Sequence, residues 1–179
     1  MNPSVVALSS RIGAGKSTIA RALSERLGWP RVSFGDYVRE VARDQGVQES
    51  RSTLQELGQS LVQRDAAGFT KAVISNVGFK SGVVVDGVRH LEILQALQRL
   101  AAPLPVHLIY VDTAEQVRIQ RLAQRGMTVD EIRTADSHST EAQVSGALRQ
   151  KAALHTRGDG DTSETVDAIV EWLKSQQHR

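Results

Sequence analysis

The sequence of 179 residues predicts a three-layer α/β fold, in which helices cover both faces of a parallel sheet. Short apolar runs rich in valine and isoleucine predict buried strands at four places: residues 5–8, 32–34, 83–85 and 106–111. Segments with helical periodicity separate these runs, and the same periodicity returns at residues 166–173. Because strand and helix alternate, the strands are expected to run parallel and to form one sheet.

The predicted helices carry recognisable end signals. Gly28 followed by Pro30 is typical of a helix C-terminus. A Ser, Thr or Asp that precedes a Gln or Glu by three residues predicts a helix start where a helical segment is expected to begin, and four such pairs are interpreted in this way: Ser52 with Gln55, Thr113 with Gln116, Thr128 with Glu131, and Asp161 with Glu164. No repeat, low-complexity tract or linker divides the sequence, so we expect a single domain over residues 1–179.

Two segments depart from the alternation of strand and helix. Residues 36–80 are helical in pattern up to about Val77, which predicts a helical insertion between the second and third strands. Residues 126–143 are polar and charge-rich with few apolar anchors, which predicts a mobile, lid-like flap.

Composition excludes several classes of protein. The 22 Lys and Arg residues and 20 Asp and Glu residues leave a net charge of +2, which argues against a nucleic-acid partner. Cysteine is absent, which excludes disulfides, thiolate metal sites and a cysteine nucleophile, and suits a reducing compartment such as the cytoplasm. The N-terminal apolar run at residues 5–8 is too short for a signal peptide or a membrane span, so we expect no membrane partner. No pattern indicates an oligomeric state.

A phosphate-binding loop follows the first predicted strand. Gly15, Lys16 and Ser17 match the pattern G-x-x-x-x-G-K-[ST], with Ser10 in place of the first glycine. The alternative interpretation is an ordinary strand-to-helix turn with a solvated lysine, but the position between an apolar strand and a long amphipathic helix favours a nucleotide site. Eight residues are therefore expected to bind the phosphates of a nucleotide: Arg11, Ile12, Gly13, Ala14, Gly15, Lys16, Ser17 and Thr18.

Each part of this loop has a distinct expected role. Successive backbone N–H groups wrap the phosphates at the start of a helix, whose dipole favours negative charge. Lys16 is expected to be catalytic, as a point charge near the β- and γ-phosphates, and Ser17 to place its hydroxyl on Mg²⁺. The predicted cofactors are thus ATP and Mg²⁺.

Proteins of many different functions share this loop, so the class of P-loop protein must be inferred from other residues. The segment Gly35-Asp36-Tyr37-Val38-Arg39 after the second strand resembles the nucleoside monophosphate kinases, adenylate kinases especially. The resemblance implies a P-loop NTPase fold with a five-stranded parallel sheet, a helical acceptor-binding insertion and a short lid. It also implies that Arg39 binds the phosphate of the acceptor and that Asp36 belongs to the same site. Taken alone, Arg39 reads as a solvated helix residue.

The third strand ends in Asp86-Gly87-Val88-Arg89. A carboxylate at the tip of an apolar strand is costly without a cationic or metal partner, so Asp86 is a candidate metal residue. A simple turn at Asp86 and Gly87 is the alternative. The segment resembles the Asp-Gly-Phe-Pro-Arg of adenylate kinases shortened by one residue, and is more similar to dephospho-CoA-kinase-like relatives. That resemblance implies an acceptor-binding Arg89.

Three arginines, Arg118, Arg121 and Arg125, follow the fourth strand on one helix face. Arg121 and Arg125 resemble the lid arginines of nucleoside monophosphate kinases and are expected to be catalytic, because phosphoryl transfer needs cations around spread negative charge. Arg118 is interpreted as a residue that opposes the helix dipole.

The polar segment that follows is expected to be the lid. Arg133 and Asp136 resemble the arginine and aspartate that recur in the lids of that family. A lone His138 is interpreted as a surface residue.

These residues together predict a phosphotransferase that moves the γ-phosphoryl of ATP to a small phosphorylated acceptor such as a nucleoside monophosphate. A dephospho-CoA-like kinase is one alternative. A nucleotide switch is another, although the guanine-reading Asn-Lys-x-Asp pattern is absent, and a kinase of nucleic-acid ends is disfavoured by the small net charge.

Overall fold

The computed structural model describes residues 1–79, 81–137 and 139–177, and its centre is a parallel sheet. In the described part of the chain the sheet has five strands in the order β2-β3-β1-β4-β5. The strands are β1 (Val5–Ser9), β2 (Arg31–Ser33), β3 (Val83–Asp86), β4 (Val106–Asp112) and β5 (Leu154–Arg157). The predicted fold class is confirmed.

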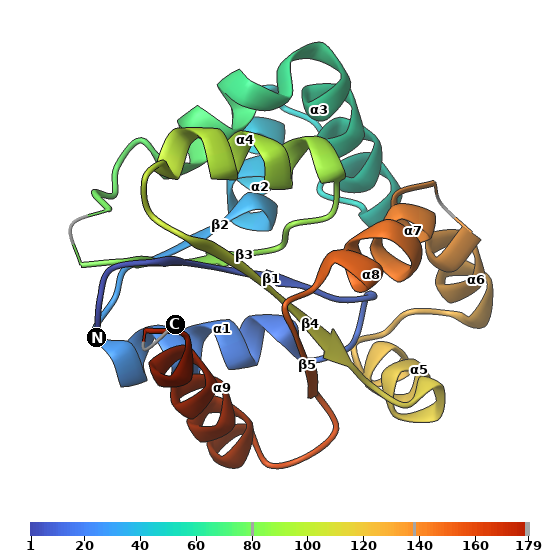
Figure 1. Ribbon diagram of the computed structural model, residues 1–179. Coiled ribbons are helices and arrows are strands. Elements are labelled where there is room, and N and C mark those ends of the chain that lie inside the picture. The colour runs from blue at the N-terminus through green and yellow to red at the C-terminus, as the bar shows by residue number, and fades with distance from the viewer. Residues whose placement is uncertain (80, 138, 178–179) are drawn as a thin grey trace.

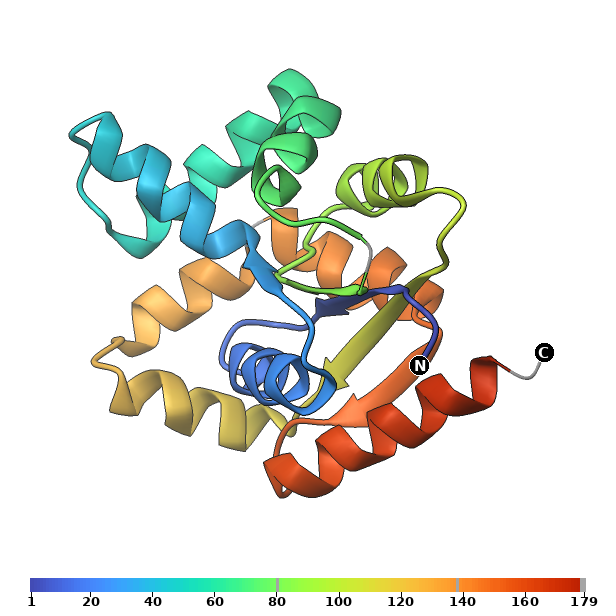
Figure 2. The same cartoon turned by 90° about the vertical axis from the view of Figure 1, so that its left-hand side faces the viewer.

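Helices cover both faces of the sheet (Figure 1). On one face lie α1 (Lys16–Leu27) and α9 (Thr162–Gln176), which pack against each other. The other face is covered by α2 (Phe34–Asp44), α3 (Arg51–Ile74) and α4 (Leu91–Ala101). The remaining helices form an arm beside the sheet, which Figure 2 shows from the side: α5 (Glu115–Gln124), α6 (Val129–Ser137), α7 (Ser139–Gln143), a π-helical turn (Val144–Leu148) and α8 (Arg149–Lys151).

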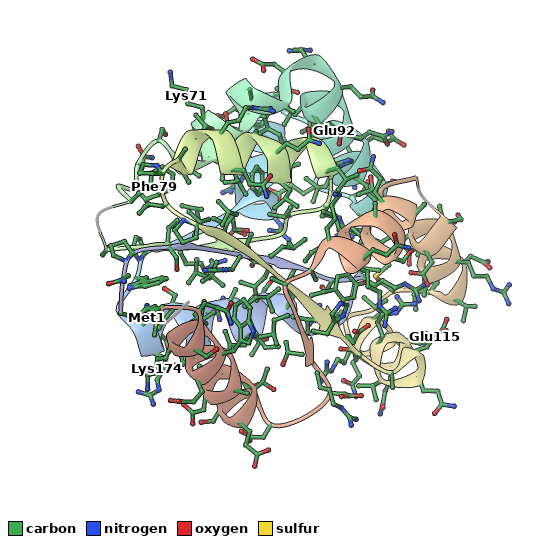
Figure 3. The ribbon with its side chains drawn as sticks, in the orientation of Figure 1. Met1, Lys71, Phe79, Glu92, Glu115 and Lys174 are labelled. Carbon is green, nitrogen blue, oxygen red and sulfur yellow. The ribbon has the colours of Figure 1, made fainter. Side chains whose placement is uncertain are left out.

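The strand residues divide between two hydrophobic cores because successive side chains of a strand point to opposite faces. In β1, Val5 and Ala7 pack towards α3 and α4, whereas Val6 and Leu8 pack towards α1 and α9. Figure 3 shows side chains filling both interlayer spaces, while charged side chains such as Glu115 project outward. A strand buried on both faces reads as a continuous apolar run, which is why β1, β3 and β4 are visible in the sequence.

Two strands differ from what the sequence pattern showed. The fifth strand has no apolar run, since its residues alternate between partly buried and exposed positions at the edge of the sheet. The second strand ends at Ser33, and Phe34 begins α2, where its ring enters the core.

Two of the four predicted helix caps are confirmed. Thr128 and Glu131 form the reciprocal box before α6, with Glu131 Oε2 accepting from Thr128 N at 2.7 Å. Asp161 accepts from the backbone of Ser163 and Glu164 at the start of α9.

The other two predicted caps are wrong. Helix α3 is capped by Ser50, two residues before Ser52, and the Ser50 hydroxyl accepts from Thr53 N at 3.2 Å. Thr113 does not cap α5, because its hydroxyl donates instead to the carbonyl of Ala14 at 2.9 Å.

The two irregular segments are helical in the structure. The insertion consists of α2 and α3 with a loop at residues 45–50 between them, and α3 has non-helical backbone angles at Asp65. The lid-like segment has apolar anchors that the pattern did not show: Ile132 and Ala135 of α6 pack on Leu122 in a small third core. Within the described residues, no helix has the length and apolar character needed to cross a membrane.

Candidate active site

A cavity of about 420 Å³ opens at the carboxyl ends of β1, β2 and β3. This is the edge at which ligands bind in open parallel sheets. Among the described residues, eight Arg and Lys side chains line the cavity, but only two carboxylates do, Asp36 and Asp86. The whole chain has a net charge of only +2, so the fold concentrates its positive charge here. Such a surface suits a ligand with several negative charges.

The predicted phosphate-binding loop joins β1 to α1 along one wall of this cavity. Gly15 precedes the helix with a φ of 89°, a left-handed conformation that favours glycine. Carbonyl groups of the loop are bonded from outside: Ile12 O accepts from Arg118 Nη1 at 3.1 Å, and Ala14 O accepts from Thr113 at 2.9 Å and from Arg121 Nη1 at 3.3 Å. These contacts fix the path of the loop.

Backbone N–H groups at the start of α1 are free to bind a ligand. In the described residues, the N–H groups of Gly15, Lys16 and Ser17 donate to no other backbone group. Free N–H groups at a helix N-terminus form a site for anions such as phosphate, because the helix dipole adds to their charge.

Lys16 lies inside the cavity in an ion pair with Asp86. Burial lowers the pKa of Lys16, and the charge of Asp86 opposes this shift. Asp86 is almost fully buried and also accepts from Arg31 Nη1 at 3.1 Å. The buried carboxylate therefore has two cationic partners, which explains how it is tolerated at the end of an apolar strand.

The predicted acceptor residues line the opposite wall of the cavity. Asp36 pairs with Arg39 at 2.8 Å and with Arg31 at 3.2 Å. Arg89 pairs with the buried carboxylate of Glu141 from α7. Burial, and after it the charge of Arg51, lowers the pKa of Arg89 to about 10, so this arginine remains a cation at neutral pH.

Two residues of α3 on this wall were missed from the sequence. Arg51 and Gln55 line the cavity, and both are partly buried. Burial and then the charge of Arg39 lower the pKa of Arg51. Their spacing of four residues at the start of a helix places them on one face, which is the only sequence signal they give. Gln55 was interpreted as part of a helix cap, a role that the structure does not support.

Arg118 has a larger role than the predicted opposition to the helix dipole. Its side chain is 1% exposed and donates to Asp136 of α6 at 2.9 and 2.6 Å as well as to Ile12 O. Asp136 also pairs with Arg11 of the loop at 3.2 Å. Asp136 thus links the predicted lid to the phosphate-binding loop, and Arg118 is the buried centre of the link.

The two predicted catalytic arginines, Arg121 within α5 and Arg125 at its C-cap, both line a second cavity, but of the two only Arg125 also lines the main one. Arg125 is exposed and reaches the main cavity. Arg121 lines the second cavity, which has a volume of about 220 Å³, and donates to Gly158 O at 2.7 Å. Gly158 lies so close to Ala14 O that a Cβ atom there would collide with it. This second cavity borders Gly15 on the outer side of the loop.

Of the described residues in the predicted lid, Thr140 lines the main cavity and Arg133 does not. Arg133 is exposed and lines neither of these two cavities. His138 falls outside the described residues, as does position 80 at the end of the predicted insertion. All eight predicted loop residues, with Asp36, Arg39, Asp86, Arg89 and Arg125, line the main cavity.

The residues present fit a magnesium ion held partly by phosphate. No group of three or more His, Asp or Glu side chains among the described residues could hold a metal by itself. Mg²⁺ in phosphate sites usually takes one or two protein oxygens and completes its shell with phosphate and water. Ser17 offers an exposed hydroxyl at the cavity, and Asp86 offers a carboxylate across from it.

The sheet order, the loop and the cavity define a P-loop NTPase with a kinase-like fold. Residues 12–140 match the AAA domain family, and the chain belongs to that family. It is also related to the UPF0200 proteins. One from Pyrobaculum aerophilum is 32% identical over 126 residues, which cover 70% of this chain and 68% of the relative. Another from Thermococcus kodakarensis is 30% identical over 130 residues, 68% of each chain.

Solved kinase structures share the fold across nearly the whole chain. Shikimate kinase from Aquifex aeolicus has a TM-score of 0.60 and 17% identity, with 97% of this chain and 98% of that chain covered. A gluconokinase from Sinorhizobium meliloti has a TM-score of 0.58 and 16% identity, with 97% of each chain covered. At this identity the likeness establishes the fold alone.

Proposed function

We propose that the protein is a phosphotransferase that moves the γ-phosphoryl of ATP to a small phosphorylated acceptor, such as a nucleoside monophosphate. One observation carries the proposal: the phosphate-binding loop, Arg39, Arg89 and Arg125 all line one cavity. Transfer between two anions requires cations that hold both of them and the charge between them. An assembly of eight cationic side chains around one cavity meets that requirement.

Each residue has a role in direct, in-line transfer. The free N–H groups at the start of α1 bind the β-phosphate, and Lys16 binds the β- and γ-phosphates. Arg39 and Arg89 hold the acceptor opposite, while Arg125 reaches the transferring group from α5. Ser17 and Asp86 would hold Mg²⁺, which would neutralise phosphate charge. The second cavity beside Gly15 and Arg121 is where we place the nucleoside of ATP.

A hydroxy acid is a second candidate acceptor. The fold neighbours are named for shikimate and gluconate, which carry a carboxylate and accept phosphate on a hydroxyl group. Asp36 favours this candidate, because a carboxylate in the cavity could take the proton of a hydroxyl. Dephospho-CoA would also offer a hydroxyl, on its ribose.

The test is ATP consumption by the full chain with Mg²⁺ over a panel of possible acceptors. The panel contains ribonucleoside and deoxynucleoside monophosphates, dephospho-CoA, shikimate and gluconate. We expect turnover with a monophosphate, and Asp36→Asn should then affect the acceptor KM rather than kcat. A large loss of kcat in Asp36→Asn would support a hydroxyl acceptor. No turnover, together with tight ATP binding, would identify a nucleotide switch instead.

A further inference from the structure

Helix α3 presents one stripe of side chains to the cavity. The residues that line the cavity from this stripe are Arg51, Gln55, Gly58, Gln59 and Val62. They follow one another at intervals of four, three, one and three residues, which keeps them on a single face of a helix. The stripe faces a cavity whose other side is the phosphate-binding loop. Its chemistry therefore bears on what the cavity binds besides ATP.

Two side chains of the stripe have buried donors without acceptors. In the described structure, Arg51 Nε and Gln55 Nε2 are buried and have no hydrogen-bond partner. A buried donor without a partner destabilises a fold, and the large majority of buried side-chain polar atoms in proteins are bonded. Ser9 Oγ and Arg118 Nε are also buried without partners among the described residues, but Arg51 and Gln55 lie one helical turn apart on the wall of the cavity, where one ligand can supply both acceptors.

The charges around Arg51 show what kind of ligand this is. Arg39 is paired with Asp36, and Arg89 is paired with Glu141. Among the described residues, no carboxylate pairs with Arg51. Arg51 nevertheless lies close enough to Arg39 for its pKa to be lowered, and it lowers the pKa of Arg89 in turn. Three cations that repel one another in a partly buried cavity are stabilised by an anion bound between them.

An apolar wall adjoins the stripe. Phe34, Leu54 and Phe69 line the same cavity, and the rings of Phe34 and Phe69 are 5.2 Å apart. A compact sugar phosphate or polyol would leave this wall in contact with water. A planar heterocycle would cover it and offer ring oxygens or nitrogens to an amide donor.

We propose that Arg51 and Gln55 bind the acceptor, and that the acceptor is nucleotide-like. Arg51, with Arg39, binds its phosphate, and Gln55 donates a hydrogen bond to its heterocycle, which packs on the wall of Phe34 and Phe69. This proposal rests on the proposed kinase function and assigns the acceptor side of that site to α3.

The test is equilibrium binding, so that it does not depend on turnover. The full chain carries Mg²⁺ and a non-hydrolysable imido analogue of ATP, and isothermal titration measures binding of AMP, GMP, CMP, UMP and their parent nucleosides. We expect at least one monophosphate to bind about 10-fold or more tightly than its nucleoside. Arg51→Gln should weaken that monophosphate about 10- to 100-fold and leave its nucleoside unchanged. Arg64→Gln, an exposed arginine of the same helix, is the matched control and should bind as the wild type does.

Two further variants separate the two roles and guard against misfolding. Arg51→Lys retains the charge but not the planar fork of the guanidinium, so it should recover part of the affinity. Gln55→Met should weaken the monophosphate and its nucleoside alike, by about 3- to 10-fold, whereas the exposed control Gln63→Met should not. Wild-type affinity in Arg51→Gln, or absence of binding by all four monophosphates, would overturn the proposal. Monophosphate binding that depends on Arg51 without any turnover would leave it standing and refute the kinase function alone.

Discussion

The two walls of the cavity differ in how their polar groups are bonded. On the loop wall, carbonyl groups accept from Thr113, Arg118 and Arg121, and Lys16 is paired with Asp86. On the α3 wall, buried donors of Arg51 and Gln55 have no partner in the described residues. On the loop wall the chain bonds the polar groups named above, although Arg118 Nε is also buried without a partner in the described structure, whereas on the α3 wall both buried donors lack an acceptor.

This difference separates changes that should affect the stability of the fold from changes that should affect only the binding of a ligand. Contacts that the chain makes with itself stabilise the folded state, so changes to them alter stability and nucleotide binding together. A buried donor without a partner lowers the stability of the ligand-free fold, so replacing it should not destabilise that fold further. Changes on the α3 wall should therefore weaken acceptor binding without destabilising the ligand-free fold.

The largest effect is expected for Lys16→Ala. Removing the cation that we propose binds the β- and γ-phosphates should lower kcat about 10³-fold, because no other lysine lines the cavity in the described structure. The fold should be retained, since Asp86 keeps its contact with Arg31. Coupled assays of ATP consumption and circular dichroism measure the two quantities. Lys71→Ala, at an exposed position, is the control. A kcat within tenfold of wild type would exclude Lys16 from catalysis.

Arg118→Met should show that contacts on the loop wall stabilise the fold. The change leaves Asp136 with Arg11 as its cationic partner and leaves Ile12 O without its guanidinium donor. Breaking a buried ion pair typically costs about 3 kcal/mol or more. We expect the free energy of unfolding in urea to fall by about that amount, and the KM for ATP to rise as the loop loosens.

Arg133→Met is the control for this prediction. It also replaces an arginine near the lid, but an exposed one whose weak pair with Asp130 spans 4.0 Å. Its effect on stability should stay below about 0.5 kcal/mol. Equal effects of the two variants would show that Arg118 stabilises the fold no more than an exposed arginine does.

The sequence predicts the two walls of the cavity to different extents. The loop was predictable because its residues are contiguous and follow a strand buried on both faces, which gives a continuous apolar run. Arg118 was misread because its partner Ile12 lies 106 residues away, and no local pattern shows such a contact. The edge strand β5 was missed for a related reason, since its residues are only partly buried.

The α3 wall was harder still to predict. Arg39 and Arg89 follow strands within short patterns, but Arg51 and Gln55 lie on a helix inside the insertion. Their role depends on which helix face meets the cavity and on which donors find no partner. Both follow from packing, and a spacing of four residues alone is common on any helix.

Arg39→Ala should confine its effect to the acceptor. The side chain is 46% exposed and Asp36 keeps Arg31 as a partner, so stability should change little. Loss of a guanidinium contact to phosphate should raise the acceptor KM about 10- to 100-fold while the KM for ATP stays within about twofold. Initial-rate kinetics with each substrate varied in turn provide the measurement. Acceptor kinetics identical to wild type would show that Arg39 is a surface residue.

The smallest effect is expected at the cap of α3, and it compares the structure directly with the sequence. The structure makes Ser50 the cap, whereas the sequence pattern pointed to Ser52. Ser50→Ala should lower the free energy of unfolding by about 1 kcal/mol, and Ser52→Ala by less than about 0.5 kcal/mol. Because Ser50 fixes the turn that carries Arg51, Ser50→Ala should also raise the acceptor KM a few-fold without changing the KM for ATP. Urea denaturation and initial rates test both effects, and a larger stability loss in Ser52→Ala would return the cap to the position that the sequence indicated.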